Sequence, residues 1–449
     1  MDKTSPTGSN RKMTPHREAL TFAARPRLRF FEHLVCNLSI SAFATAVRIS
    51  LLALVLGLSQ DACASSPSAT AGLSVGRASE VGVDPQILNQ AAALIRETVA
   101  EKEIPGAVIL IAREGKIILH HAFGHRDLQC TLPMQTDSLF RMASNSKAIT
   151  AAGIMLLVED GKLDLDKPVG TYLHAFRNER WRAITLRHLL THTSGIRIKP
   201  LFLTPLIKPL FLTPLIQRSA THPHAPDLRL EVDRFAAIAP LEPAGKTYSY
   251  NNACYNTLAA VIEEVTGSYK QHLRDRIYKP MGMLDSCNHE SDANHDRMST
   301  VLRRQRDGSW SKGWQPGDAP DWPFPRGSGG MISSSRDYAL FCQMLLNQGQ
   351  HGNQQILSSD SVREMTNPQG HHCEAAINYG LGWKVSEAGG TFSHTGSDGT
   401  FVWVNPHRNL IGMVLTQCNG VNPPRAEFRQ LVESACITPE GVNDEIDSE

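Results

Sequence analysis

Two apolar hairpin patterns at opposite ends of the chain constrain its fold more than any other feature. The first, "GAVILIAREGKIILHHAFG", has apolar runs at residues 107–112 and 116–120 separated by a short polar turn. The second, "TFVWVNPHRNLIGMVLTQ", repeats the design, with Asn405 and Pro406 at the start of its turn. Hairpins at both ends of a chain predict one antiparallel sheet to which both ends contribute strands.

The sequence between the hairpins has helical periodicity. Three segments carry apolar residues at helical spacing and reach a glycine at or soon after their end, namely residues 149–160, 255–266 and 337–347. The last opens with Ser334 and Asp337 three residues apart, a capping-box pattern. The predicted fold is therefore α/β of the α+β type, an antiparallel sheet flanked by helices with an inserted, mainly helical lobe. A cleft between two such lobes is a common place for a ligand.

Length and composition indicate an ordinary globular protein. Of the 449 residues, 41% are hydrophobic and 20% are charged, which is enough apolar surface for a substantial core. We predict a leader at residues 1–64 and one domain at 65–449, with its sheet lobe at about 80–140 and 330–436 and its helical lobe at about 141–329. The formal net charge of +1 gives no field to attract DNA or RNA, so no nucleic-acid partner is expected.

The first 64 residues differ from the rest and predict export. Six arginines and lysines between residues 11 and 29 precede an apolar stretch, and Ala62, Cys63 and Ala64 offer the small side chains that a signal peptidase requires. The apolar core at residues 49–58 is short for a membrane span, which needs about 20 residues. We therefore expect a periplasmic or secreted protein cleaved near Ala64, with an uncleaved anchor or a lipoprotein attached through Cys63 as alternatives.

Cysteine and histidine spacings indicate no metal site. Seven cysteines would remain after cleavage, and their spacing matches no zinc pattern. We expect small buried apolar side chains, with one disulfide as an alternative and at least one free thiol. Two short histidine motifs, at residues 222–224 and 371–373, lack an acidic or histidine partner at ligand spacing. Both are therefore interpreted as loop residues.

A serine and a lysine begin the first predicted helix in an arrangement that capping alone does not explain. In "FRMASNSKAIT", Ser144 is the expected N-cap, which places Lys147 in the first turn, where the helix dipole disfavours a cation by about 0.3–1 kcal/mol. Residues three apart on a helix share a face, so the amine can lie beside the hydroxyl and help to remove its proton. The pattern is weak by itself, because Ser309 and Lys312 repeat it where no helix is expected.

Four motifs in order resemble one family of enzymes. The run "DSLFRMASNSKAITAAGIMLLVEDGKLDLDKPVGTYL", followed by "ITLRHLLTHTSGI", resembles serine β-lactamases, penicillin-binding peptidases and related esterases, in the branch around class C β-lactamases. "PAGKTYSYNNACYNTLAAVIEEVTG", "RGSGGMISSSRD", and "YGLGW" with "SHTGSDGTFVWV" match its later motifs. One departure is Asn251, where the family usually has serine. The resemblance covers roughly residues 81–432 and implies a β-lactamase/transpeptidase-like fold.

The resemblance also implies a serine hydrolase with an acyl-enzyme intermediate. Ser144 would attack a carbonyl, Lys147 would lower the cost of deprotonating it, and Tyr250 would relay the proton to the leaving group. Water would then release the acyl group, and no metal or organic cofactor is expected. His192 in "LLTHTSG" corresponds to a structural part of its motif, so no catalytic role is expected for it.

The same resemblance assigns substrate binding to Asn252, His394, Thr395, Gly396 and Ser397. Asn252 would orient the catalytic lysine and the substrate amide, while the N–H groups of the nucleophile and of Ser397 would hold the oxyanion. His394 and Thr395 would steady the catalytic tyrosine and bind a substrate carboxylate. His394 stands where β-lactamases often have lysine, so we expect a cation whose charge depends on pH.

Three functions remain open at this point. An exported hydrolase of esters or D-amino-acid peptides is favoured, because the histidine at the third motif occurs in peptidase and esterase relatives. A true β-lactamase and a non-catalytic penicillin-binding or wall-binding module are the alternatives. The expected partner is thus a small ester, β-lactam or peptide substrate, and we expect a monomer.

A perfect tandem repeat follows "HTSGIRI". Residues 199–207, "KPLFLTPLI", are repeated without change at 208–216. Their four prolines argue against a helix or a central strand, so we expect a surface loop with apolar side chains. The repeat is either a neutral insertion or an apolar wall that binds an acyl chain or makes weak contact with a membrane surface.

Overall fold

The computed structural model describes residues 72–196, 225–370, 378–386, 390–421 and 423–437. The predicted leader, the tandem repeat at 199–216 and the two histidine motifs lie outside these residues. Their assignments, and the domain limits that depend on them, therefore remain predictions. Within the described ranges, no helix is both long enough and apolar enough to cross a membrane.

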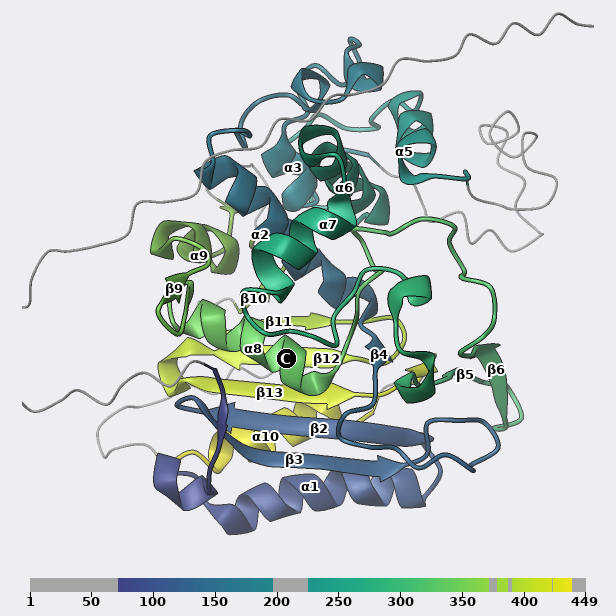
Figure 1. The fold of residues 1–449 in the computed structure, drawn as a ribbon, viewed down its shortest axis with the longest axis vertical. Helices are drawn as coiled ribbons and strands as arrows, with labels where there is room; N and C mark the ends of the chain where they lie inside the picture. Colours follow the sequence, from purple (N-terminus) through teal and green to yellow (C-terminus); the bar gives the residue numbers. More distant parts are fainter. Residues whose placement is uncertain (1–71, 197–224, 371–377, 387–389, 422, 438–449) are drawn as a thin grey trace, which may run out of the picture. The chain divides into compact units, whose positions relative to one another are not determined.

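A seven-stranded sheet forms from strands near both ends of the described chain (Figure 1). Its strands are β1 (Ser74–Val75), β2 (Gly106–Arg113), β3 (Lys116–Gly124), β10 (Lys384–Val385), β11 (Phe392–Thr395), β12 (Phe401–Asn405) and β13 (Leu410–Leu415). Their order is β1-β3-β2-β13-β12-β11-β10, and each neighbouring pair is antiparallel except β1 with β3. The pairing of β2 with β13 sets Ile109 opposite Val414 and so joins the two ends. The predicted sheet is confirmed, with a parallel edge strand in addition.

The central strands are apolar because both faces of the sheet are covered. All of β13 is buried, and so is β2 up to its last residue. In the turn between β12 and β13, the Asn405 side chain accepts a hydrogen bond from the Arg408 N–H at 3.2 Å, and Asn409 takes a positive φ of 47°. The turn that begins at Asn405, between β12 and β13, is therefore formed as the sequence predicts.

Helices from the two ends of the described chain cover one face of the sheet (Figure 1). They are α1 (Pro85–Ala100) and α10 (Arg425–Ser434). Asp84 caps α1 by accepting the Gln86 N–H at 2.7 Å. Beneath the helices, Trp403 of β12 meets Phe428 of α10 edge to face, with 6.0 Å between ring centroids. Side chains of both helices and of β2, β3, β12 and β13 form one core cluster on this face.

The helix α8 (Ser335–Leu346) packs on β2 and β13 from the opposite face. Ser334 caps it by accepting the Asp337 N–H at 3.3 Å, as its capping pattern predicts. The remaining α-helices of the described ranges are α2 (Ser146–Glu159), α3 (Leu186–Leu190), α5 (Leu228–Ala236), α6 (Asn252–Thr266), α7 (Tyr269–Leu273) and α9 (Ser359–Thr366). The three helices predicted from periodicity are present and begin two or three residues earlier than expected.

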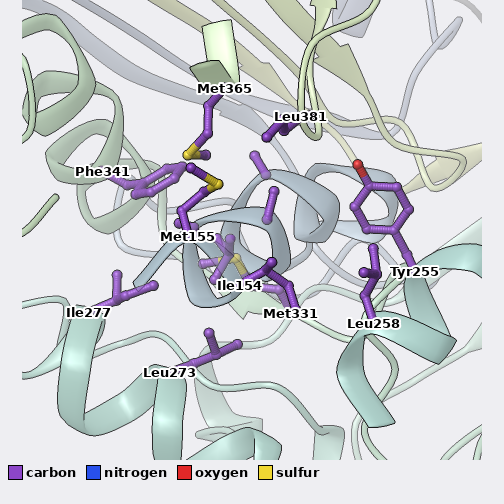
Figure 2. Close-up of a cluster of buried hydrophobic side chains, with 14 of the residues drawn as sticks. Ile154, Met155, Tyr255, Leu258, Leu273, Ile277, Met331, Phe341, Met365 and Leu381 are labelled. Carbon is purple, nitrogen blue, oxygen red and sulfur yellow. The ribbon is translucent and has the colours of Figure 1, made fainter. Parts of the chain in front are cut away.

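The helix α2 is the centre of the second core. It is buried from residue 146 to residue 157 and packs against α6, α7 and α9. Figure 2 shows Ile154 and Met155 of α2 among the apolar side chains of Leu258, Leu273 and Phe341, which belong to α6, α7 and α8. A helix that is apolar all round must be enclosed in this way, because no face of it can meet water.

Short strands complete the described structure. They are β4 (Phe140–Arg141) paired with β7 (Ile332–Ser333), β5 (Val301–Arg304) between β6 (Trp310–Trp314) and β14 (Cys418–Asn419), and β8 (Gln350–His351) paired with β9 (Gln354–Gln355).

The second serine–lysine pair lies at β6 and the turn before it, outside any helix. Ser309 donates to Asp307 at 2.6 Å and Lys312 to Asp318 at 3.2 Å. The six described cysteines are free.

We expect Gly412→Ala to destabilise the fold. Gly412 in β13 lies opposite Trp403 in β12, and a Cβ there would come within 2.0 Å of the indole ring. Making room for it should lower the free energy of unfolding by about 1–3 kcal/mol, as measured by urea denaturation. Gly329→Ala is the matched control, because its Cβ would lie 3.5 Å from its nearest neighbour. An equal loss of stability in both variants would contradict this packing argument.

Candidate active site

The candidate nucleophile Ser144 lies in a 3₁₀ turn, Ala143–Asn145, between β4 and α2. The helix begins only at Ser146, so the prediction that Ser144 is its N-cap is wrong. Ala143 has a φ of 46°, a left-handed conformation that is strained for a residue with a Cβ. Ser146 secures the turn, because its hydroxyl donates to the Ala143 carbonyl at 2.6 Å and accepts the Met331 N–H at 2.9 Å.

Lys147 occupies the first turn of α2 and is completely buried. Its Nζ lies 3.0 Å from Ser144 Oγ, 2.9 Å from Asn252 Oδ1 and 2.8 Å from the Ser328 carbonyl oxygen. The structure therefore brings together the serine and lysine of the first motif and the second asparagine of the Tyr-Asn-Asn motif.

Burial also determines the charge of this lysine. It lowers the pKa of Lys147 well below its ordinary value of 10.5, and the nearby Arg326 guanidinium adds to the effect. A neutral amine has two N–H donors and one lone pair. When the donors bind the oxygens of Asn252 and Ser328, the lone pair faces the Ser144 hydroxyl. Lys147 is thus arranged as a general base toward Ser144.

Tyr250 reaches the same place from the segment before α6. Its ring centroid lies 4.7 Å from Lys147 Nζ, and 43% of the residue is exposed along the pocket that it lines. The loss of hydration inside the site raises the pKa of Tyr250, and a hydrogen bond with Ser144 partly opposes this shift. The phenol therefore keeps its proton at neutral pH and can serve as an acid.

His192 and Asn251 hold the segment that carries Tyr250. The side chain of Asn251 caps α6 and donates to the Ile196 carbonyl at 2.7 Å. Its backbone N–H donates to His192 Nδ1 at 3.1 Å, and the His192 ring lies 4.4 Å from the Tyr250 ring. His192 is thus a structural support in this arrangement. Asn252, the next residue, turns its side chain to Lys147 instead of capping the helix.

His394 in β11 is buried and neutral, which contradicts the expected cation. Its Nδ1 lies 2.9 Å from the Thr395 carbonyl oxygen, and its Nε2 lies 3.2 Å from the Tyr379 hydroxyl. Because a carbonyl oxygen only accepts, Nδ1 carries the proton and Nε2 accepts from Tyr379. Burial, with a smaller effect of Lys147, lowers the pKa of His394 to about 3. The ring therefore offers no charge to a substrate carboxylate.

A pocket of about 440 Å³ opens beside these groups. Its lining combines the nucleophile, the third motif and several aromatic side chains, namely Ser144, Tyr248, Tyr250, Asn378, Tyr379, Lys384, Ser393, His394, Thr395 and Ser397. Five of the eight predicted site residues are in this set. The other three are not among the lining residues, but Lys147 Nζ contacts both Ser144 and Asn252. Gly396 packs on the nucleophile turn, where a Cβ would come within 2.7 Å of the Met142 carbonyl oxygen.

Sequence reasoning missed the aromatic part of this lining. Tyr248 precedes Tyr250 by two residues in "TYSYNN", and side chains two apart in an extended segment point the same way, which is a signal that could have found it. Tyr379 stands in "YGLGW", a motif recognised only as a whole. Lys384 and Ser393 are neighbours across β10 and β11, a pairing that no local pattern indicates.

Known proteins with related sequences point to one family. The beta-lactamase family profile matches residues 91–436. Protein Rv1367c of Mycobacterium tuberculosis is 27% identical over 369 residues, which cover 73% of this chain and 89% of that protein. Esterase EstB of Burkholderia gladioli is 33% identical over 200 residues, which cover 43% of this chain and 49% of the esterase.

A solved structure shows the same fold. EstCE1, described as a hydrolase with promiscuous acyltransferase activity, aligns with a TM-score of 0.64 and 22% identity over 78% of this chain and 98% of its own. At this identity the likeness concerns the fold alone. The profile match extends over most of the sequence and includes the first, second and third motifs. The chain therefore belongs to the beta-lactamase family, whose members are serine hydrolases.

Proposed function

We propose that this chain is a serine esterase that forms an acyl-enzyme on Ser144. The observation that supports this most is the buried amine of Lys147, whose Nζ lies 3.0 Å from Ser144 Oγ. A serine beside such a base can lose its proton as it attacks a carbonyl. Membership of the family makes an acyl-serine reaction the expected chemistry.

Each proton in the proposed cycle has a carrier. Ser144 Oγ bonds to the ester carbonyl carbon while its proton passes to Lys147 Nζ. The backbone N–H groups of Ser144 and Ser397, two residues of the pocket, stabilise the oxyanion. Tyr250 gives its phenol proton to the departing alkoxide and is reprotonated by Lys147. Water then attacks the acyl-enzyme through the same proton transfers and frees Ser144.

The pocket lining favours an uncharged ester with an apolar group. Tyr248, Tyr250 and Tyr379 line the pocket, and the rings of Tyr248 and Tyr379 are 5.9 Å apart. Aromatic rings of this kind bury apolar substrate groups well. The volume of about 440 Å³ suits a small molecule. The similarity to an esterase, EstB, supports the same substrate class.

The alternatives have less support. A β-lactamase is expected to bind its substrate carboxylate at the third motif, where burial lowers the pKa of His394 and leaves it uncharged. A non-catalytic binding module has no need of a base aligned with Ser144. Lys384 also lines the pocket, and its charge suits substrates with a carboxylate, so D-amino-acid peptides are the second candidate class and β-lactams the third.

We expect Ser144→Ala to reduce hydrolysis of p-nitrophenyl butyrate by at least about 10³-fold, because the attacking oxygen is removed. The release of p-nitrophenol measures the rate, and covalent labelling by a fluorescent fluorophosphonate should disappear with it. Turnover of nitrocefin or of a D-Ala-D-Ala peptide faster than that of any ester would contradict the esterase assignment.

Ser309→Ala is the matched control for that experiment. It removes a hydroxyl from the same residue pattern, but Ser309 lies in the turn between β5 and β6 and bonds Asp307. Its rate and labelling should equal those of the parent protein. If Ser309→Ala were inactive and Ser144→Ala active, the assignment of the nucleophile would be wrong.

We expect kcat/KM to rise as Lys147 loses its proton, at a lower pH than an ordinary lysine would give. The base works only when it is unprotonated, and its lowered pKa moves this rise toward acidic pH. His394, with a pKa of about 3, contributes no step near neutrality. His394→Gln keeps an acceptor for Tyr379, so it should leave the acid limb in place. The pH–rate profiles of the variant and the parent are compared. A shift of the acidic side of the profile in the variant would show that His394 titrates in the pH range in which the enzyme works.

We also propose that the protein is exported. The support is the basic and apolar leader with Ala62, Cys63 and Ala64 at its end. Mass spectrometry of the protein from fractionated cells should find a mature N-terminus just after Ala64. An intact N-terminus in the cytoplasmic fraction would be the contrary result.

A further inference from the structure

The two turns that supply the proposed oxyanion donors are hydrogen-bonded to each other. We call residues 142–145 the nucleophile turn and residues 396–400 the third-motif turn. Thr400 Oγ1 donates to the Met142 carbonyl oxygen at 3.0 Å and accepts from Asn145 Nδ2 at 2.9 Å. One side chain of the third-motif turn therefore binds both ends of the nucleophile turn.

A buried ion pair connects the third-motif turn to the strand β4, which ends directly before the nucleophile turn. Arg141 lies three residues before Ser144, and Asp398 directly follows Ser397. Arg141 Nε is 3.3 Å from Asp398 Oδ2, and the two residues are only 7% and 8% exposed. Little water screens charges at this depth, so their attraction is stronger than that of a surface pair. Loss of either charge should therefore change the position of the two segments relative to each other.

Arg141 is fixed at its backbone and along its side chain. Gln417 Oε1 accepts the Arg141 N–H at 3.0 Å, and Gln417 Nε2 donates to the Arg141 carbonyl at 3.3 Å. The guanidinium lies over Trp314, with 5.4 Å from its carbon to the ring centroid. Because the arginine is held in these ways, the ion pair acts mainly on the position of Asp398 and of the third-motif turn.

Two further carboxylates share this guanidinium. Asp321 lies 2.9 Å from Arg141 Nη1, and Glu290 lies 3.7 Å from Nε. Burial by itself would lower the pKa of Arg141, but its attraction to the carboxylates, Asp398 first, raises it. The side chain of Asp321 is 45% exposed and belongs to neither turn. It therefore offers a comparison for Asp398 at the same cation.

We propose that the Arg141–Asp398 ion pair positions the third-motif turn so that the N–H groups of Ser144 and Ser397 bind one oxyanion. This inference rests on the proposed function, because it takes both N–H groups as oxyanion donors. The oxyanion exists only after attack on the carbonyl, so a displaced donor lowers kcat more than it weakens substrate binding. Arg141 and Asp398 are positioning residues, since neither is among the residues that line the pocket.

The test compares Asp398→Asn with Asp321→Asn. Each variant removes one carboxylate charge from the same guanidinium, but only Asp398 belongs to the third-motif turn. We expect Asp398→Asn to lower kcat for p-nitrophenyl butyrate by about 10–100-fold, with KM changed by less than about twofold. Asp321→Asn should keep the parent kcat. In every case kcat is calculated per active site, counted by titration with a fluorophosphonate.

Counting the active sites distinguishes a lower kcat per site from a loss of folded protein and from a failure of the proposed function. If Asp398→Asn had fewer titrated sites but the parent kcat at each of them, the role of Asp398 would be merely structural, and the inference would be overturned. An equal kcat in the two variants would overturn it as well. If the parent protein itself were not labelled, the proposed function would be the one to fail.

Asp398→Glu is the second variant, and it serves also where Asp398→Asn does not fold. It keeps the carboxylate on a longer side chain, so the ion pair can form with the turn displaced. We expect its kcat per titrated site to lie below that of the parent, and above that of Asp398→Asn, with KM retained. The parent kcat in Asp398→Glu, or a kcat no higher than that of Asp398→Asn, would overturn the inference.

Discussion

The burial of Lys147 among uncharged oxygens is the constraint on which the rest of the site depends. A buried ammonium without a counter-ion costs several kcal/mol of solvation free energy, so the group loses its proton instead. Its neighbours, Ser144 Oγ, Asn252 Oδ1 and the Ser328 carbonyl oxygen, are all neutral. In an ordinary helix this residue would be a defect, because the first turn disfavours a cation. Here the same conditions produce an amine that can accept a proton from Ser144.

Those three oxygens come from separate parts of the chain, so core packing sets the distances between them. Ser144 precedes α2, Asn252 begins α6, and Ser328 lies in the loop before β7. The helix α2 packs against α6, and Ile154 and Met155 hold it in the apolar cluster of Figure 2. A polar site that needs hydrogen-bond distances near 3 Å therefore depends on apolar side chains well away from it.

The sequence predicted which polar side chains meet in the site better than it predicted their charge states. Hairpin patterns at both ends predicted the sheet, but the two-residue β1 and the 3₁₀ turn at Ser144 have no periodic signal and could not be found. The pairing of Ser144 with Lys147 follows from a spacing of three, whereas the neutrality of His394 depends on burial and on the Tyr379 hydroxyl. The contact of Arg141 with Asp398 likewise depends on how distant turns meet, which no local pattern encodes.

A second guanidinium, that of the half-buried Arg326, lies between the ion-pair cluster and Lys147 in its electrostatic effects. Arg326 lies over Trp322, 4.9 Å from the ring centroid, and donates to the Gly329 carbonyl at 3.2 Å. Burial, and then Arg141, lower the pKa of Arg326 to about 10, so it remains charged at neutral pH. Its charge in turn lowers the pKa of Lys147. Arg141 and Arg326 thus keep their positive charge, because carboxylates lie close to them. The charge of Arg326 disfavours a further cation at Lys147, whose hydrogen-bond acceptors are all neutral.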